Sequence, residues 1–180
     1  IEHVEHALRT ATFLLAHVND CPVGTERILT ESGATVAYCP RAHAYFAHER
    51  TLGPHPYERL IDAGVPVAIA TDSIVNIPPD QSDRISPLDD ARLLRARDGV
   101  DAHALLRMIT TIPARALGLD DQLFTLEQGT ATLAFNALPV GPDAPLDPAV
   151  AAFDSDALPT LLSPDIEPSR TLETLRRANR

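Results

Sequence analysis

The chain has 180 residues, a formal net charge of −10 at pH 7 and a hydrophobic fraction of 44%. This length is typical of one domain, and the apolar content is sufficient to bury a core. A strongly acidic surface argues against binding of nucleic acid, because phosphate recognition needs clustered Lys and Arg side chains. We therefore expect a globular protein without a nucleic-acid partner.

The chain shows neither a membrane span nor an export signal. No stretch approaches the ~18 to 20 apolar residues of a transmembrane helix, and no charged-then-apolar segment opens the sequence. The two cysteines, Cys21 and Cys39, each adjoin a proline and are too few for a disulfide scaffold. We predict a cytoplasmic protein that does not contact a membrane. Because the first residue is Ile1 and a helix-like stretch is already under way at Glu2, we also expect the chain to be part of a longer protein.

Short apolar runs alternate with stretches of helical periodicity along the first third of the chain. The pattern predicts helices and strands in the order helix 2–11, strand 12–16, helix 25–33 with Thr25 as its N-cap, strand 34–38, helix 57–63 and strand 65–70. Apolar strands separated by helices are typical of a parallel sheet covered on both faces.

The rest of the chain is expected to be less regular. A polar loop over 78–83 precedes helix-like stretches over 88–97 and 101–117. Two short strands around a turn at Gln128-Gly129 are predicted within 125–138. A Pro-, Asp- and Ala-rich remainder follows from 139 and ends in an amphipathic stretch near 172–175.

Two residues able to bind a metal or transfer a proton follow predicted strands, namely His17 and Asp72. The carboxyl ends of parallel strands are where active sites lie in such sheets. Imidazole and carboxylate suit a divalent metal site or a general acid–base pair, but a catalytic metal usually has three protein ligands. Each residue also has a structural alternative, because a strand-end Asp often caps the next helix and a single His often serves as a hydrogen-bonded structural residue.

Three ordered stretches resemble successive strand-end signatures of the amidohydrolase superfamily: LLAHVN at 14–19, AYCPRAHAYF at 37–46 and AIATDS at 68–73. More narrowly, they are similar to its branch of cytosine, guanine, S-adenosylhomocysteine and chlorotriazine hydrolases. Residues 105–133 resemble the segment that joins the barrel of that branch to its β-sandwich.

The resemblance implies an α/β fold, the C-terminal part of a (β/α)8 TIM barrel with its last three strands and helices. Part of a small β-sandwich appendage would follow. Residues 1–120 then form the partial barrel, 121–140 the sandwich segment and 141–180 a tail with a terminal helix.

The resemblance also implies roles for individual residues. His17 matches the histidine that ends the sixth barrel strand, which binds the metal or hydrogen-bonds the attacking water or the substrate. Asp72 matches the aspartate that ends the eighth strand, a metal ligand that also accepts the proton of the attacking water. Arg41, His43 and Tyr45 lie in the loop after the seventh strand and are predicted to face the substrate, although His43 and Tyr45 could instead pack beneath that loop.

The remaining histidines and cysteines carry weaker expectations. His48 and His55 are minor candidates for the site, and Cys39 is predicted to pack as a small hydrophobic residue. The family pattern also has an H-x-H pair on the first barrel strand and a histidine on the fifth, and the sequence contains no counterpart of either. We therefore expect the first five strands to lie outside this chain, and the chain by itself to self-associate as a homo-oligomer or to expose apolar surface.

Two functions remain open from the sequence. The first is a metal-dependent amidohydrolase or deaminase, part of a longer enzyme, that uses zinc, or iron or manganese, to activate water against a non-peptide C–N bond. Its substrate would be a small heterocyclic amine or amide. The alternative is a truncated, catalytically inactive α/β module or an interaction fragment.

Overall fold

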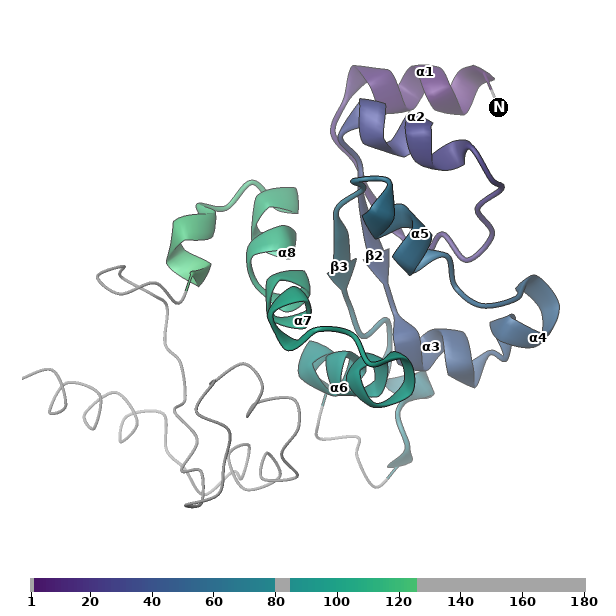
Figure 1. Ribbon diagram of the computed structural model, residues 1–180, viewed down its shortest axis with the longest axis vertical. Coiled ribbons are helices and arrows are strands. Elements are labelled where there is room, and N and C mark those ends of the chain that lie inside the picture. The colour runs from purple at the N-terminus through teal and green to yellow at the C-terminus, as the bar shows by residue number, and fades with distance from the viewer. Residues whose placement is uncertain (1, 80–84, 126–180) are drawn as a thin grey trace, which may run out of the picture.

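The computed structural model describes residues 2–79 and 85–125 of the chain (Figure 1). The strands predicted within 125–138, except for Thr125 itself, and the whole tail from 139 lie outside these residues. So does most of the proposed sandwich segment.

Three parallel strands form one sheet in the order β1-β2-β3. They are β1 (Leu14–Ala16), β2 (Thr35–Tyr38) and β3 (Val67–Ile69). All three lie inside the predicted apolar runs, and β2 and β3 are buried along their full length. The parallel sheet predicted from the sequence is therefore confirmed for the part of the chain that the structure describes.

Helices connect and follow the strands: α1 (Glu2–Thr10), α2 (Thr25–Ser32), α3 (Pro40–Tyr45), α4 (His48–Leu52), α5 (Tyr57–Asp62), α6 (Pro87–Asp98), α7 (Ala102–Ile109) and α8 (Thr111–Ala116), with the 3-10 turns η1 (Ile74–Asn76) and η3 (Asp121–Phe124). Figure 1 shows α7 and α8 beside β3 at one edge of the sheet. Helices α1 and α2 lie together, away from that edge.

One face of the sheet carries the core. Val36 and Tyr38 of β2 share this face with Val67 and Ile69 of β3, because paired residues in a parallel register point the same way. The helices contribute Leu8, Leu29, Leu60, Leu94, Leu105 and Met108 to the same cluster. Burial of a leucine side chain contributes about 1.5–3 kcal/mol relative to its exposed state, so this face accounts for much of the packing energy.

The opposite face of the sheet is built from small residues. Ala16, Ala37 and Ala68 form a row across the three strands and lie outside the core cluster. At the β1 edge this face is open, since Leu14 is 44% exposed and Ala16 is also exposed. The predicted covering of both faces of the sheet therefore holds for β2 and β3, which are buried along their full length, and fails at the β1 edge.

The start of α2 differs from the prediction. The N–H of Thr25 donates to the carbonyl of Pro22 at 3.1 Å and closes a tight turn. A type II turn has a positive φ at its third residue, and Gly24 in that place has φ 95° and ψ −13°. Gly24 is therefore the N-cap, and Thr25 is the first helical residue.

Proline explains two further differences. The helix predicted over 101–117 is divided at Thr110 into α7 and α8, because Pro113 has no N–H to continue a helix and is accommodated in a new first turn. Pro40, two residues beyond β2, is the first residue of α3, a position that its fixed φ favours. Helices α3 and α4 were both missed in the loop after the second strand.

Candidate functional site

The two strand-end candidates meet at the carboxyl edge of the sheet. Nε2 of His17 lies 4.0 Å from Oδ1 of Asp72, and their side chains are 41% and 30% exposed. His17 follows β1 directly, and Asp72 lies just beyond β3. The two side chains are thus near enough to share a hydrogen-bonded ligand or a cation, and both remain accessible to solvent.

The backbone is strained at both strand ends. His17 has φ 65°, Val18 φ 54° and Asp72 φ 68°, all in the left-handed region that residues other than glycine seldom adopt. The N–H of Val18 donates to the carbonyl of Ala16 at 2.9 Å, which makes His17 the centre of a γ-turn of the rare positive-φ kind. Such conformations cost about 1–3 kcal/mol each and gather at functional sites.

Buried side chains bind the backbone at each of these points. Nε2 of His55 lies 2.7 Å from the carbonyl oxygen of His17. Around Asp72, the Oδ1 atom of Asn76 accepts the N–H of Ser73, and its Nδ2 donates to the carbonyl of Thr71, both at 3.1 Å. The residues on either side of Asp72 are therefore fixed by one amide group.

The capping alternative for Asp72 is not what the structure shows. The residue that precedes the short helix η1 is Ser73, whose N–H is bound by Asn76. Asp72 lies outside this turn and faces His17. Its carboxylate is therefore free to serve the strand-end site.

Of the three residues predicted to face the substrate, His43 and Tyr45 occupy different environments. His43 is buried on α3, and its Nδ1 lies 3.1 Å from Oδ1 of Asn19, which joins the loops that follow β1 and β2. Burial lowers the pKa of His43. Tyr45 is exposed and packs edge-on against Phe46.

Arg41 is held in an ion pair inside the helical layer. Its Nε donates to Oδ2 of Asp90 at 2.9 Å, its backbone N–H donates to Oδ1 at 3.0 Å, and its Nη2 donates to the carbonyl of Ser86 at 3.1 Å. Asp90 is fully buried, and this burial raises its pKa while the bonds from Arg41 oppose the rise. Arg41 thus joins α3 to α6, and its contact with a substrate stays a prediction.

Cys39 has the environment that the sequence predicted. It is buried at the end of β2, and burial, with the nearby Asp72 and Asp90 carboxylates, raises the pKa of its thiol to about 12. A thiol with such a pKa carries no thiolate near neutral pH. Cys39 therefore packs as a small hydrophobic residue.

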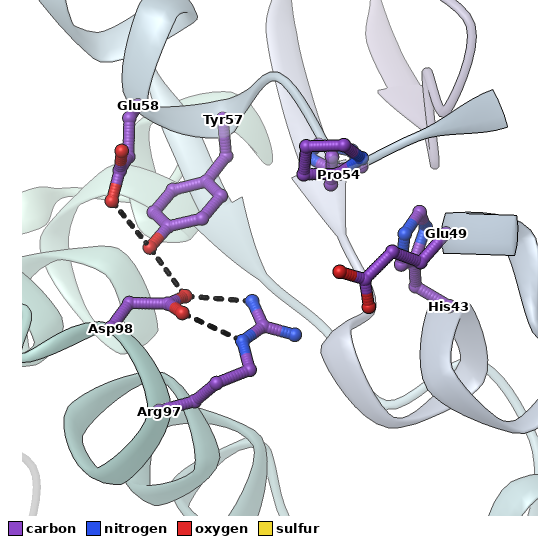
Figure 2. Close-up of a pocket in the computed structure, with 8 residues that line it drawn as sticks. His43, Glu49, Pro54, Tyr57, Glu58, Arg97 and Asp98 are labelled. Atoms are coloured by element: carbon purple, nitrogen blue, oxygen red, sulfur yellow. Dashed lines mark hydrogen bonds and ion pairs between the residues drawn. The ribbon is translucent and has the colours of Figure 1, made fainter.

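A cavity of about 230 Å³ lies among residues of the helices and of the segment before α5. It is lined by His43, Glu49, Pro54, His55, Tyr57, Glu58, Arg97 and Asp98. Figure 2 shows Tyr57 and Arg97 both directed at Asp98, with Glu49 across the cavity from Arg97. Neither His17 nor Asp72 lines it.

The donor atoms of His17 and Asp72 suit a divalent metal, but they are two ligands. Among the residues described, no three His, Cys, Asp or Glu side chains come together in a way that could hold an ion. Imidazole nitrogen and carboxylate oxygen are accepted by zinc, iron and manganese alike. The pair therefore fits part of a metal site, and its chemistry does not choose the metal.

Comparison with known protein families assigns the chain to one of them. The amidohydrolase family matches residues 2–134, which is most of the chain. The chain belongs to the amidohydrolase family. No solved structure was found to match it.

The most similar curated relatives of this amidohydrolase chain share one name, 5-methylthioadenosine/S-adenosylhomocysteine deaminase. The protein from Teredinibacter turnerae is 37% identical over 107 residues, which cover 57% of the chain and 23% of the relative. Those from Halobacterium salinarum and Moorella thermoacetica are each 35% identical, over 59% and 64% of the chain and over 24% and 27% of their own lengths. The matched region thus spans about a quarter of these relatives.

Within the described residues of this amidohydrolase chain, no helix is both long and apolar enough to span a membrane.

Of two residues that shape the site, the sequence did not single out Asn76, and it gave His55 only as a minor candidate without a partner. Asn76 interrupts an apolar run, Ile74-Val75-Asn76-Ile77, and a buried Asn at a turn is a signal of side-chain bonding to the backbone. His55 stands between two prolines, which indicates a rigid segment but does not reveal its partner. His55 hydrogen-bonds a backbone carbonyl that is distant in the sequence, and Asn76 hydrogen-bonds backbone groups across a turn. These partners can be identified only from the tertiary structure.

Proposed function

We propose that the protein is a metal-dependent amidohydrolase that hydrolyses the bond between an amino group and a heterocyclic ring. The observation that supports this most directly is the approach of His17 Nε2 to Asp72 Oδ1, 4.0 Å apart at the carboxyl edge of the sheet. Membership of the amidohydrolase family and the deaminase names of the relatives agree with such an activity.

His17 and Asp72 would hold the metal together with ligands from outside the described residues. A divalent metal bound there lowers the pKa of a water molecule, which supplies a nucleophile near neutral pH. Zinc suits the donor set, as do iron and manganese. The partial exposure of both side chains leaves room for a ligand between them.

Two residues of this chain would then transfer protons and hydrogen-bond the reacting group. The carboxylate of Asp72 accepts a proton as the water oxygen bonds to the ring carbon that carries the amino group. The imidazole of His17, within reach of the same carboxylate, hydrogen-bonds the reacting group. The C–N bond then breaks, and the proton held by Asp72 goes to the nitrogen, so that ammonia leaves and the ring carbon keeps the oxygen.

Substrate contact is proposed for Tyr45, Arg41 and His43, in that order of accessibility. Tyr45 is exposed at the end of α3, whereas His43 is buried and Arg41 is engaged by Asp90. Direct contact with a substrate therefore suits Tyr45, and support of the loop suits the other two. For the substrate, we propose an adenosine derivative, such as the two compounds named in the relatives.

We also propose a cytoplasmic location and self-association. Cys21 and Cys39 are both buried free thiols, which a reducing compartment preserves. The apolar Leu14 side chain on the open face of β1 suits contact with another chain.

The test is release of ammonia from 5-methylthioadenosine and from S-adenosylhomocysteine. The protein is expressed from the whole open reading frame that contains these 180 codons and is supplied with zinc. Asp72→Asn removes the charged group at nearly constant volume, and Asp62→Asn, exposed on α5, is the matched control. We expect turnover by the wild type and the control and its loss in Asp72→Asn.

Two results would contradict the proposal. The absence of ammonia from both compounds in the wild type would remove the proposed substrate class. Equal turnover in the wild type and Asp72→Asn would remove the proposed role of this carboxylate. The 180-residue chain assayed alone tests the inactive-module alternative, which ammonia release by that chain would rule out.

A further inference from the structure

His55 contacts the main chain of His17 in a way that fixes the hydrogen on its ring. Nε2 of His55 lies 2.7 Å from the carbonyl oxygen of His17. A carbonyl oxygen can only accept, so Nε2 carries the hydrogen and donates it. The tautomer of His55 is therefore assigned by its partner.

The imidazole of His55 has little freedom to move. The ring is stacked on Tyr38 with a centroid separation of 3.7 Å and an interplanar angle of 14°. Tyr38 is fully buried at the end of β2, and its hydroxyl accepts a hydrogen bond from Arg97 at 3.3 Å. Pro54 and Pro56 flank His55 and restrict its backbone.

His17 is held by both of its main-chain groups. Its N–H donates to the carbonyl of Ala37 at 2.9 Å, and its carbonyl accepts from His55. Its φ of 65° is unfavourable and persists only where neighbouring contacts impose it. With both backbone groups engaged, the direction of the Cα–Cβ bond of His17 is set, and the imidazole is directed to the site edge where Asp72 lies.

We propose that His55 is a positioning residue for His17, which holds the left-handed γ-turn at the end of β1 through its Nε2–H and so aims the His17 imidazole at Asp72. This assignment rests on the proposed function of the His17–Asp72 pair. His55 does not touch the reacting atoms, because its ring lies on the helical side of the sheet against Tyr38. It acts through the backbone of His17.

Three variants separate the hydrogen bond from the packing. His55→Phe keeps an aromatic ring on Tyr38 but removes the donor, whereas His55→Gln keeps an N–H donor at about the same reach. His6→Gln changes an exposed histidine on α1 and is the control. Circular dichroism and thermal unfolding show whether each variant is folded.

The first readout does not depend on activity. Nuclear magnetic resonance of the 180-residue chain reports the main-chain carbon shifts of His17 and Val18, which differ between left-handed and other conformations. We expect these shifts to move in His55→Phe and to stay close to wild type in His55→Gln and His6→Gln. Unchanged shifts in a folded His55→Phe variant would overturn the positioning role, whether or not the protein is a deaminase.

The second readout is the kinetics of the protein from the whole open reading frame. Loss of residues that orient a metal ligand typically costs about 10- to 100-fold in activity or metal affinity. We expect kcat of His55→Phe to fall within that range with KM little changed, and His55→Gln to recover most of the loss. A fall in His55→Gln equal to that in His55→Phe would show that packing, and not the donor, matters and would overturn the proposal.

Failure of the proposed function has a different signature. In that case the wild type shows no turnover, while the carbon shifts of His17 still respond to His55→Phe. If instead the wild type releases ammonia and a folded His55→Phe variant has the same kcat, the positioning role of His55 is wrong and the proposed deaminase activity is retained.

Discussion

Nε2 of His17 and Oδ1 of Asp72 lie 4.0 Å apart, although each residue follows a different strand and a third strand separates those strands in the sheet. The left-handed backbone at both residues turns the chain at the strand ends. His55 and Asn76 bind this backbone from the buried side. Two polar side chains outside the strand-end pair thus hydrogen-bond the backbone at both of its residues.

Removal of the Asp72 carboxylate should lower the metal content of the protein. After expression with zinc in the medium, Asp72→Ala should retain at least about tenfold less zinc than the wild type, because a carboxylate ligand is lost and an imidazole alone binds weakly. The measurement is metal analysis by mass spectrometry after gel filtration, with Asp62→Ala as the control. Equal zinc in the wild type and Asp72→Ala would argue against a metal at this pair.

Breaking the pair of Arg41 and Asp90 should destabilise the fold. Asp90→Ala leaves the Arg41 guanidinium, which is 11% exposed, without its carboxylate, and a buried pair broken in this way costs about 3–5 kcal/mol. Urea denaturation at about pH 7 measures the change in the free energy of unfolding. The double variant Arg41→Met with Asp90→Leu should recover most of the stability, since it removes both charges.

The same variants distinguish structure from substrate binding at Arg41. If Arg41 only joins α3 to α6, a folded double variant should keep the KM of the wild type. A large rise in KM without a loss of stability would instead support the substrate role predicted from the sequence.

Asn76 should be needed to hold the loop around Asp72. Asn76→Ala loses both hydrogen bonds to the backbone of Thr71 and Ser73 and leaves buried polar groups unpaired, a change expected to cost about 1–3 kcal/mol. Asn76→Asp keeps the acceptor for Ser73 but loses the donor to Thr71. Urea denaturation should rank the two variants below the wild type, and an unchanged unfolding midpoint for Asn76→Ala would contradict this role.

Acidification should remove stability through His55. Burial lowers the pKa of His55 to about 4 in the folded protein, from an ordinary value of about 6.5. Between these two values the unfolded chain takes up a proton that the folded chain does not, so the free energy of unfolding falls as the pH is lowered. A full shift of this size corresponds to about 3 kcal/mol.

The His55→Phe variant isolates this effect from other titrating groups. His43, whose pKa is also lowered by burial, lies near His55, as do His17 and Arg97, and these groups are common to both proteins. The difference in unfolding free energy between the wild type and His55→Phe should therefore shift against the wild type between about pH 7 and about pH 5. A pH-independent difference would show that His55 is not a neutral buried group.

The local pattern of the chain determined the order of its three strands, and with it the position of His17 and Asp72 after strands. Strand length and helical periodicity are properties of neighbouring residues, so they can be read without a structure. The limits of this reading appear at Pro40, which lies two residues beyond β2 and opens α3, a helix that the local pattern did not predict.

Only the tertiary structure decided what the polar residues bind. Arg41 pairs with Asp90 because α3 packs on α6, which brings the two charges together and excludes water from them. No feature of the sequence near Arg41 predicts this partner. In the same way, His55 hydrogen-bonds the carbonyl of His17 because its ring, stacked on Tyr38, lies near the end of β1. Such contacts join residues far apart in the chain, and packing, not local propensity, brings them together.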